Sequence, residues 1–394
     1  MTGTLPFLDI TAPGFSTRGP EMRAARDAHF AARTPLGLAI LRHREVGLLL
    51  RDRRLRQGSH AWPQKTGITG TFASFWERSI ISQEGAPHKA LRTLALKALA
   101  PDHIAALRPA FTAHAQELLN ALPEPCEFIT QFTEPFAGRA ITTLLGLSVE
   151  EAPALAHDAS RLGLAMGLDN HLHLDVFNAA TDRLMALAER LIDRARSGED
   201  RTGFVARLLA AAQDQDQEPD PQTLKDLIVI SIFGGVDTTR AQLGFAACLF
   251  AEHPDQWQAL RADPELIPQA IEETIRTRPT TTWSSREATE EMTFQGVHIP
   301  KNTLLHLWVH ASATDPLLGA EPSFDITATR KSHFGFGGGA HHCLGAQMAR
   351  ADMACALSVL AERVTGFHHA EPPTFHPDSG NTSPVRLMLS LSRA

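Results

Sequence analysis

The segment from residue 333 to residue 350, HFGFGGGAHHCLGAQMAR, gathers the reactive side chains of this sequence most densely. It holds one cysteine and three histidines among glycines, and it continues into a helical pattern. Proteins use such residues to cradle a nucleotide phosphate, to hold a zinc ion, or to bind the iron of a haem. Which of these ligands the segment takes decides the chemistry of the protein.

The phosphate and zinc interpretations fit the segment poorly. Residues 335–340 satisfy a GxGxxA pattern, and Glu362 follows at about the distance where such a loop has its acidic residue. A dinucleotide loop comes directly after a buried strand, however, and the preceding TATRKSH is polar. Zinc ligands come from rigid elements, whereas His341, His342 and Cys343 are consecutive on a glycine loop and cannot easily point at one metal.

A haem with a cysteine thiolate ligand fits the segment better. Glycines let a backbone pass close beneath a flat porphyrin, where a side chain would collide. We place Cys343 in the first turn of a helix, where free N–H groups and the helix dipole favour the thiolate. His341 lies two residues earlier and supplies a cation for a porphyrin carboxylate. These residues therefore favour a haem-thiolate site.

On these residues the chain resembles the cytochrome P-450 superfamily. Residues 336–345, FGGGAHHCLG, are similar to the superfamily's cysteine-ligand loop. The resemblance implies that Cys343 ligates the iron of haem b (iron protoporphyrin IX), and that Phe336, His341 and Gly345 belong to the cofactor-binding loop. It also implies a mainly α fold with a small β portion, in which a long central helix passes over a buried haem.

The apolar segment at 223–253 carries the motif GGVDTT at residues 234–239. Two adjacent glycines inside a helix cost about 1 kcal/mol each relative to alanine, and a buried aspartate costs more unless it is paired. A core helix that breaks local rules in this way indicates a functional site. The motif resembles the superfamily's oxygen-activation motif. This implies that Asp237 connects to solvent and delivers protons, that Thr238 hydrogen-bonds dioxygen, and that Gly234 leaves it room.

Two further patterns support the resemblance. Glu273 and Arg276 stand three residues apart, on one helical face. They are similar to the superfamily's ExxR, which implies a structural role in a buried network that braces the haem loop. A set of cations, similar in order to those that bind the porphyrin carboxylates in the superfamily, comprises His88, Arg92, Arg286 and His341.

The resemblance also places side chains on the substrate side of the haem. By position these are Ile230, Phe233, Thr282, Trp283, Ser284 and Thr382. A wall rich in serine and threonine, with phenylalanine and tryptophan, suits a mid-sized, mostly apolar molecule with one or two polar groups. A terpenoid, an aromatic compound or a natural-product intermediate fits this description.

The activity implied is that of a monooxygenase, an oxidoreductase that uses O2 to hydroxylate, epoxidise or oxidatively dealkylate its substrate. The chain shows no flavin or iron–sulfur segment, so electrons from NAD(P)H must arrive through redox partners, in the usual bacterial arrangement a ferredoxin and ferredoxin reductase. Lys89, Lys97, Lys331 and Arg350 are predicted to meet an acidic partner. The alternative is a haem-thiolate protein of peroxide-using or gas-sensing type, which the acid and threonine of GGVDTT disfavour.

The elements that must position these residues are mostly helices. Helical periodicity is found at 20–33, 44–52, 86–99, 101–122, 175–196, 223–253, 265–278 and 343–364. Strand patterns are confined to 36–40, 292–299, 303–309 and 385–392. The helix at 223–253 is apolar on most faces and is expected to cross the core. No linker interrupts residues 20–390, so we expect a single domain spanning 1–394.

Composition excludes several classes of protein. The net charge is −7 and the pI is near 6.2, which disfavours a general nucleic-acid binder. The sequence contains no run of eighteen apolar residues, so it predicts no membrane span. The first residues do not resemble a secretory signal. The four cysteines form no CxxC pair, which suits a reducing compartment. We therefore expect a cytoplasmic monomer.

Overall fold

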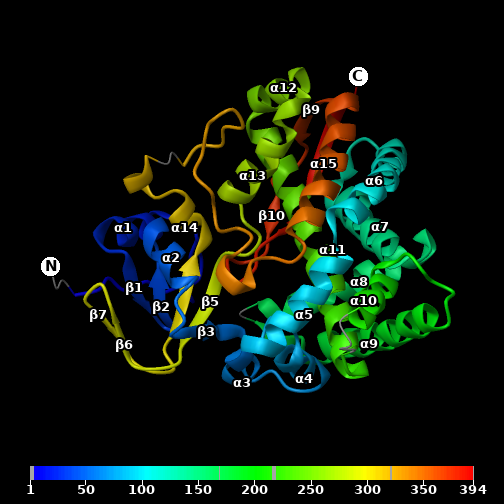
Figure 1. Cartoon of the computed structure of the whole chain (residues 1–394). Coiled ribbons are helices and arrows are strands. Elements are labelled where there is room, and N and C mark those ends of the chain that lie inside the picture. Colours follow the sequence, from blue (N-terminus) through cyan, green and yellow to red (C-terminus); the bar gives the residue numbers. More distant parts are fainter. Residues whose placement is uncertain (1–3, 168, 215–218, 320–321, 394) are drawn as a thin grey trace.

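The computed structural model describes residues 4–167, 169–214, 219–319 and 322–393. It is mainly helical with a small β portion, as predicted (Figure 1). The α-helices are α1 (Pro20–Ala28), α2 (His43–Leu49), α3 (Trp62–Thr66), α4 (Thr71–Arg78), α5 (Gly85–Ala98), α6 (Pro101–Ala121), α7 (Glu134–Leu145), α8 (Ala152–Gly163), α9 (Leu174–Arg196), α10 (Phe204–Gln213), α11 (Pro221–Glu252), α12 (Pro254–Ala262), α13 (Ile267–Thr277), α14 (Val309–Ala313) and α15 (Ala346–Arg363).

The largest sheet of the described residues has the strand order β1-β2-β8-β5-β3, and a three-stranded sheet has the order β4-β12-β9. In the five-stranded sheet, β2 and β8 are parallel, and the other pairs of neighbouring strands are antiparallel. The strands are β1 (Ala31–Thr34), β2 (Gly37–Ile40), β3 (Leu55–Gln57), β4 (Cys126–Glu127), β5 (Trp283–Ala288), β6 (Met292–Phe294), β7 (Val297–Ile299), β8 (Leu304–Trp308), β9 (Val364–His369), β10 (Thr374–Phe375), β11 (Pro384–Arg386) and β12 (Met388–Arg393). In Figure 1 the largest sheet lies with the N-terminal helices to one side of the larger helical part.

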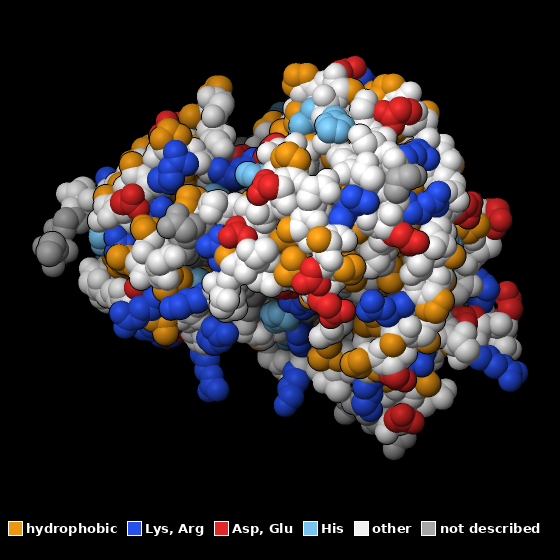
Figure 2. All heavy atoms as spheres, turned by 90° about the horizontal axis from the view of Figure 1, so that it is seen from above, with side chains coloured by type: hydrophobic (Ala, Val, Ile, Leu, Met, Phe, Trp, Pro, Cys, Tyr) orange, Lys and Arg blue, Asp and Glu red, His pale blue; other side chains and the backbone are white. Residues whose placement is uncertain are grey.

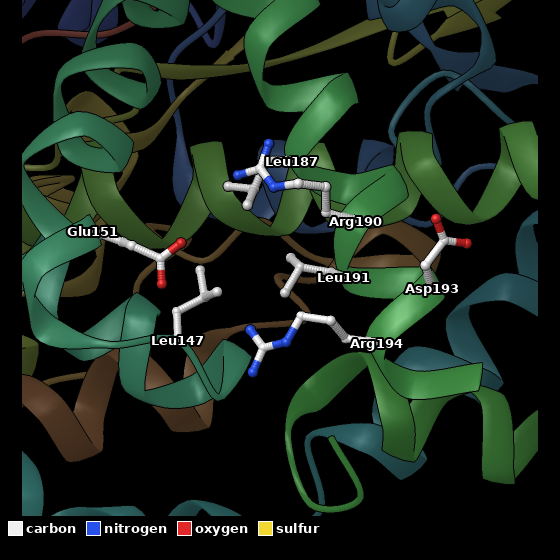
Figure 3. Close-up of a pocket in the computed structure, with 7 residues that line it drawn as sticks. All are labelled: Leu147, Glu151, Leu187, Arg190, Leu191, Asp193 and Arg194. Atoms are coloured by element: carbon white, nitrogen blue, oxygen red, sulfur yellow. The ribbon is translucent and has the colours of Figure 1, made fainter. Parts of the chain in front are cut away.

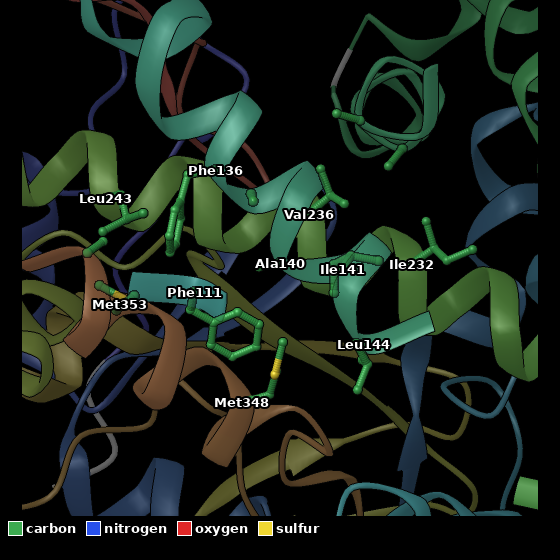
Figure 4. Packing of buried hydrophobic residues seen from close by; sticks show 14 of the residues in the cluster. Phe111, Phe136, Ala140, Ile141, Leu144, Ile232, Val236, Leu243, Met348 and Met353 are labelled. Carbon is green, nitrogen blue, oxygen red and sulfur yellow. The ribbon is translucent and has the colours of Figure 1, made fainter. Parts of the chain in front are cut away.

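Helix α11 crosses the core, as its apolar sequence predicts. Asp220 caps its first turn by accepting hydrogen bonds from the backbone N–H groups of Gln222 and Thr223, and Pro221 takes the first helical position. Figure 4 shows how α6, α7, α11 and α15 pack together through buried apolar side chains. Those labelled are Phe111, Phe136, Ala140, Ile141, Leu144, Ile232, Val236, Leu243, Met348 and Met353. This packing fixes α11, which carries the predicted GGVDTT motif, and α15, which follows the loop of Cys343.

Most of the predicted helices are confirmed within two or three residues. The segment at 20–33 is different, because only its first part is helical. Helix α1 ends at Ala28, and His29 has extended backbone angles. Residues from Ala31 onward form β1, which pairs with β2 along the edge of the largest sheet. Pairing with a distant strand overrides the helical pattern of these residues, because both alanines of β1 are fully buried there.

The predicted strand at 292–299 is also wrong in detail, since it is a hairpin of β6 and β7. Gln295 and Gly296 between the strands have φ angles of +47° and +82°, the conformation of a tight hairpin turn. The predicted strand at 385–392 likewise divides into β11 and β12. The strands predicted at 36–40 and 303–309 are confirmed as β2 and β8.

The charged surface is mixed in sign. Figure 2 shows Lys and Arg side chains interspersed with Asp and Glu on the face seen from above, with hydrophobic side chains scattered between them. In the described part of the chain, none of the helices combines the length and apolar character that spanning a membrane requires.

Candidate functional site

The glycine-rich segment forms a loop that packs between helices α2 and α13. A Cβ added to Gly335 would overlap the Ile275 side chain, and one added to Gly339 would overlap the Leu50 carbonyl group. Gly339 also has a φ of +69°, which glycine adopts without steric cost. We expected these glycines to give clearance beneath a porphyrin. At these two positions close packing against the protein already requires glycine.

Cys343 lies at the end of this loop rather than in a helix. Its backbone N–H donates to the Phe336 carbonyl oxygen over 2.8 Å, and this bond closes the loop. Helix α15 begins only at Ala346, with Gly345 at its N-cap. The prediction that Cys343 occupies the first helical turn is therefore wrong, because the bond to Phe336 holds its backbone in the loop.

The thiol of Cys343 is free and accessible, with protein packed around its other sides. Burial raises the pKa of the Cys343 thiol, whereas a hydrogen bond from the Gly345 N–H and the charges of Arg92 and Arg350 lower it. A donor and two cations thus stabilise negative charge on this sulfur. The arrangement suits a thiolate ligand of a soft metal centre.

His88 and His341 lie in contact on one side of the loop. Their ring centroids are 4.2 Å apart, and His341 Nε2 lies 3.1 Å from Glu84 Oε1. Burial, followed by the charge of His341, lowers the pKa of His88 to about 4. Glu84 is thus the carboxylate that contacts His341, and a further anion at this place would favour the charged form of His88.

Arg92 and Arg286 complete the predicted set of cations. Arg286 on β5 is buried, and its Nη1 donates to Gln57 Oε1 over 3.0 Å. Burial lowers the pKa of Arg286 to about 10, and it also lowers the pKa of Arg92. Among the described residues, no carboxylate lies within ion-pair distance of either guanidinium. A buried guanidinium without a carboxylate partner is a ready site for a bound anion.

On helix α11, Gly234 and Thr238 are more accessible than their neighbours. A Cβ added to Gly234 would meet no atom within 4 Å, so the helix faces open space at this point. Thr238 is half-buried one turn later, and its Oγ1 donates to the Gly234 carbonyl oxygen over 2.6 Å. Gly234 thus leaves room beside the Thr238 hydroxyl, whose oxygen remains able to accept a hydrogen bond.

Asp237 is buried instead of opening to solvent. Its Oδ1 accepts a hydrogen bond from Arg240 Nη2 over 2.8 Å, and the same nitrogen lies 3.4 Å from Ser383 Oγ. The expected contact of Asp237 with solvent is therefore not seen, because the guanidinium on the next turn of α11 covers the carboxylate. Proton transfer to Asp237 requires a change at this ion pair.

Glu273 and Arg276 form a buried ion pair on α13. Arg276 Nε and Nη2 donate to the two carboxylate oxygens of Glu273 over 2.6 and 2.7 Å. Arg276 Nη2 also donates to the Ser323 carbonyl oxygen, and the Asp325 N–H donates to Glu273 Oε1 over 3.0 Å. The pair thus fastens the chain around residues 323–325, shortly before the loop of Cys343, to α13.

The residues predicted for a substrate pocket fall into two groups. The hydroxyls of Thr282 and Thr382 are engaged, since they donate to the backbone carbonyl oxygens of Ser379 and His376. The Thr282 bond fastens the residue before β5 to Ser379, whereas the Thr382 bond is local to the chain at 376–382. The other group is less enclosed or apolar and comprises Ile230, Phe233, Trp283 and Ser284. Of these, the half-buried Ser284 lies beside the glycine loop, since a Cβ added to Gly337 would meet its Oγ at 3.9 Å.

The comparison with known proteins agrees with this geometry. The family model described as Cytochrome P-450 matches residues 166–372. Luteothin monooxygenase of Streptomyces thioluteus is 33% identical over 400 residues, which cover 99% of this chain and 97% of that protein. The chain belongs to the cytochrome P-450 family. Nocardicin C N-oxygenase of Nocardia uniformis subsp. tsuyamanensis is 28% identical over 99% of this chain and 98% of its own length.

The solved structure of cytochrome P-450 CYP109Q5 from Chondromyces apiculatus shares the fold. It superposes with a TM-score of 0.87 at 24% identity, and the match covers 99% of this chain and 100% of that one. The named relatives of this cytochrome P-450 include a monooxygenase, an N-oxygenase and a hydroxylase/epoxidase. The chain is accordingly a monooxygenase, an oxidoreductase, and as a cytochrome P-450 it uses haem and O2.

The site residues fit the haem that a cytochrome P-450 carries. A haem brings an iron that accepts a thiolate and two carboxylates that need cations. This chain offers the accessible Cys343 thiol, and it offers Arg92 and Arg286 without carboxylate partners among the described residues. His88 and His341 stand together beside them. The donor set therefore matches both ends of the cofactor.

Sequence reasoning about this cytochrome P-450 missed three acidic residues near the site. Glu84 accepts from the Gln57 N–H and lies beside His341. Glu272 on α13 pairs with Arg350 on α15, over 2.6 Å from Nε to Oε1. Asp352 is fully enclosed in α15, and Thr239 Oγ1 donates to it over 3.3 Å. None belongs to a motif, although Glu84 stands four residues before His88, at helical spacing.

A separate surface pocket lies between α9 and the segment that joins α7 to α8 (Figure 3). Its volume is about 290 Å³, and its lining residues are Leu147, Glu151, Leu187, Arg190, Leu191, Asp193 and Arg194. Arg194 is already paired with Glu199 over 2.8 Å. The pocket contains none of the predicted site residues, so it is distinct from the haem site of this cytochrome P-450.

Proposed function

We propose that this protein is a haem-thiolate monooxygenase that oxidises a mid-sized, mostly apolar natural product, as a single-domain monomer in the cytoplasm. The reaction would be a hydroxylation, an epoxidation or an oxidative dealkylation. The observation that carries the proposal is the accessible Cys343 thiol, which faces the Gly345 N–H beside cationic side chains on a backbone tied to the Phe336 carbonyl oxygen. The four free cysteines support a reducing compartment.

The residues on the Cys343 side would bind and orient the cofactor. Cys343 would hold the iron through its sulfur, and Arg92 and Arg286 would hold the carboxylates together with His88 and His341. When bound, the haem supplies the oxidising chemistry. The hydrogen bond between the Cys343 N–H and the Phe336 carbonyl oxygen would help to position the sulfur for the iron.

The residues of α11 would handle protons on the opposite side. The proton on Thr238 Oγ1 is held by the Gly234 carbonyl oxygen, which leaves the lone pairs of the hydroxyl turned to the open space beside Gly234. Asp237, one residue earlier, would supply protons after its carboxylate separates from Arg240. While Asp237 is paired with Arg240, its carboxylate would not transfer protons to the site.

The substrate class rests on the relatives and on the lining. Relatives of 26–33% identity carry names that specify luteothin, nocardicin C, mycinamicin IV and cyclomarin C. These names specify four different compounds, so they support the class and not one compound. Ile230, Phe233 and Trp283 would contribute apolar surface, and the Ser284 hydroxyl would contribute one polar contact.

Electrons would reach the haem from NAD(P)H through a ferredoxin and its reductase. Lys89, Lys97 and Lys331 are exposed and would meet an acidic partner. Arg350, which was predicted to join them, is instead engaged by Glu272. Binding of the partner should therefore weaken when the charge of the three lysines is reversed and when the ionic strength is raised.

The test is the spectrum of the reduced protein with carbon monoxide. Wild-type protein should show the long-wavelength Soret band of a thiolate-ligated haem, and Cys343→Ser should lose it. A screen of natural products by the spin-state shift of the Soret band then identifies the substrate, and product analysis with ferredoxin, reductase and NAD(P)H identifies the reaction. Wild-type protein that lacks the band, or that purifies with zinc, would overturn the proposal.

A further inference from the structure

Arg350 on α15 lies against the loop of Cys343. Its guanidinium carbon is 4.4 Å from the centroid of the Phe336 ring, a cation–π arrangement. Both carboxylate oxygens of Glu272 on α13 accept hydrogen bonds from this guanidinium, over 2.6 Å from Nε and 3.1 Å from Nη2. The geometry is the two-pronged pairing that holds a guanidinium in one orientation.

His333, at the start of the loop, reaches the same carboxylate. The Gly335 N–H donates to His333 Nδ1 over 3.0 Å, which leaves the ring proton on Nε2. Nε2 lies 3.1 Å from Glu272 Oε2. Burial opposes ionisation of Glu272, but the contact with His333 and the hydrogen bonds from Arg350 dominate and lower its pKa to about 2. The carboxylate therefore stays charged at neutral pH and holds the loop and α15 together.

Arg350 acts on the sulfur through its charge. The guanidinium lies over the ring of Phe336, whose carbonyl oxygen accepts the Cys343 N–H over 2.8 Å, so its charge stands close to the iron ligand. A cation held beside a thiolate-ligated iron stabilises the more negative, reduced form, and so raises the reduction potential. The cation has this effect only while it is held in place. Without the carboxylate, the long arginine side chain would be retained by the ring contact alone.

We propose that Glu272 is a positioning residue that sets the reduction potential of the bound haem by holding Arg350 over Phe336. The inference rests on the proposed haem-thiolate function. It concerns the carboxylate that adjoins the ExxR pair and not the pair itself. Glu272 thereby links the position of α13 to the electrostatics of the iron ligand.

The sign of the change in potential distinguishes positioning from a direct effect of charge. Replacing Glu272 by glutamine removes a negative charge, which by itself would raise the potential. If Glu272 acts by holding Arg350, its loss releases the cation and the potential falls instead. The variant Glu272→Gln should therefore have a lower potential than wild type, and Arg350→Met should show a similar fall. In the Arg350→Met background, Glu272→Gln should lower it no further.

The experiment is redox titration of the purified holoenzymes, in which the Soret absorption band reports the fraction of reduced haem. Glu371→Gln is the matched control, because Glu371 pairs with Arg386 over 2.8 Å at an exposed place. The control should keep the wild-type potential, and thermal unfolding of each variant should show that the fold is retained. An unchanged or raised potential in Glu272→Gln overturns the inference. A missing haem-thiolate band in wild-type protein refutes the proposed function instead.

Discussion

Replacement of Glu273 by glutamine is expected to destabilise the fold strongly. The side chains of Glu273 and Arg276 are each 2% exposed, and the carboxylate also receives the Asp325 N–H. Arg330 lies 3.5 Å from Glu273 Oε1 as a second cation. A neutral amide keeps the size of the side chain but leaves a buried guanidinium without its counter-charge. Removing one partner of a buried pair costs about 3–5 kcal/mol.

That loss is a large share of the total stability, because the free energy of unfolding of a native protein is about 5–15 kcal/mol. The assay is urea unfolding of Glu273→Gln beside wild type and the exposed-pair control Glu371→Gln, with haem content measured on the same samples. The control should lose less than about 1 kcal/mol. Glu273→Gln should unfold at a clearly lower urea concentration and retain less haem. Equal losses in the two variants would refute the view that the buried pair braces the fold.

Two further predictions concern α15 and α11. Burial raises the pKa of Asp352 well above its ordinary value, although the Met353 N–H and Thr239 oppose this. Native protein therefore binds a proton that the unfolded chain releases above about pH 4, so stability falls as pH rises. Asp352→Asn should be more stable than wild type at pH 8, with a smaller difference at pH 5 in thermal unfolding; a constant difference contradicts the neutral carboxyl. Thr238→Ala should keep its haem but divert NAD(P)H electrons to hydrogen peroxide, and peroxide yield at the wild-type level would contradict the role of the hydroxyl.

The sequence was informative where a function depends on residues close together in the chain. The loop of Cys343 and the GGVDTT segment of α11 each lie within ten residues, so their residue types and spacing were enough to carry the resemblance to the family. The length of α11 follows from its apolar composition and from the Asp220 cap. Element boundaries were weaker, because β1 exists only through pairing with β2 and not through its own composition.

The acidic residues near the site show what local patterns leave out. Glu84 meets His341 across 257 positions, and Glu272 meets Arg350 across 78. A glutamate that holds a cation and one without a partner look the same in a single sequence, because the difference lies in the partner that folding supplies. Asp352 is a sharper case, since helical spacing alone gives no reason for a carboxyl among buried apolar residues of α15. Its burial costs free energy at neutral pH, and such a cost is retained where a polar group serves a specific contact, here with Thr239, the residue after Thr238 on α11.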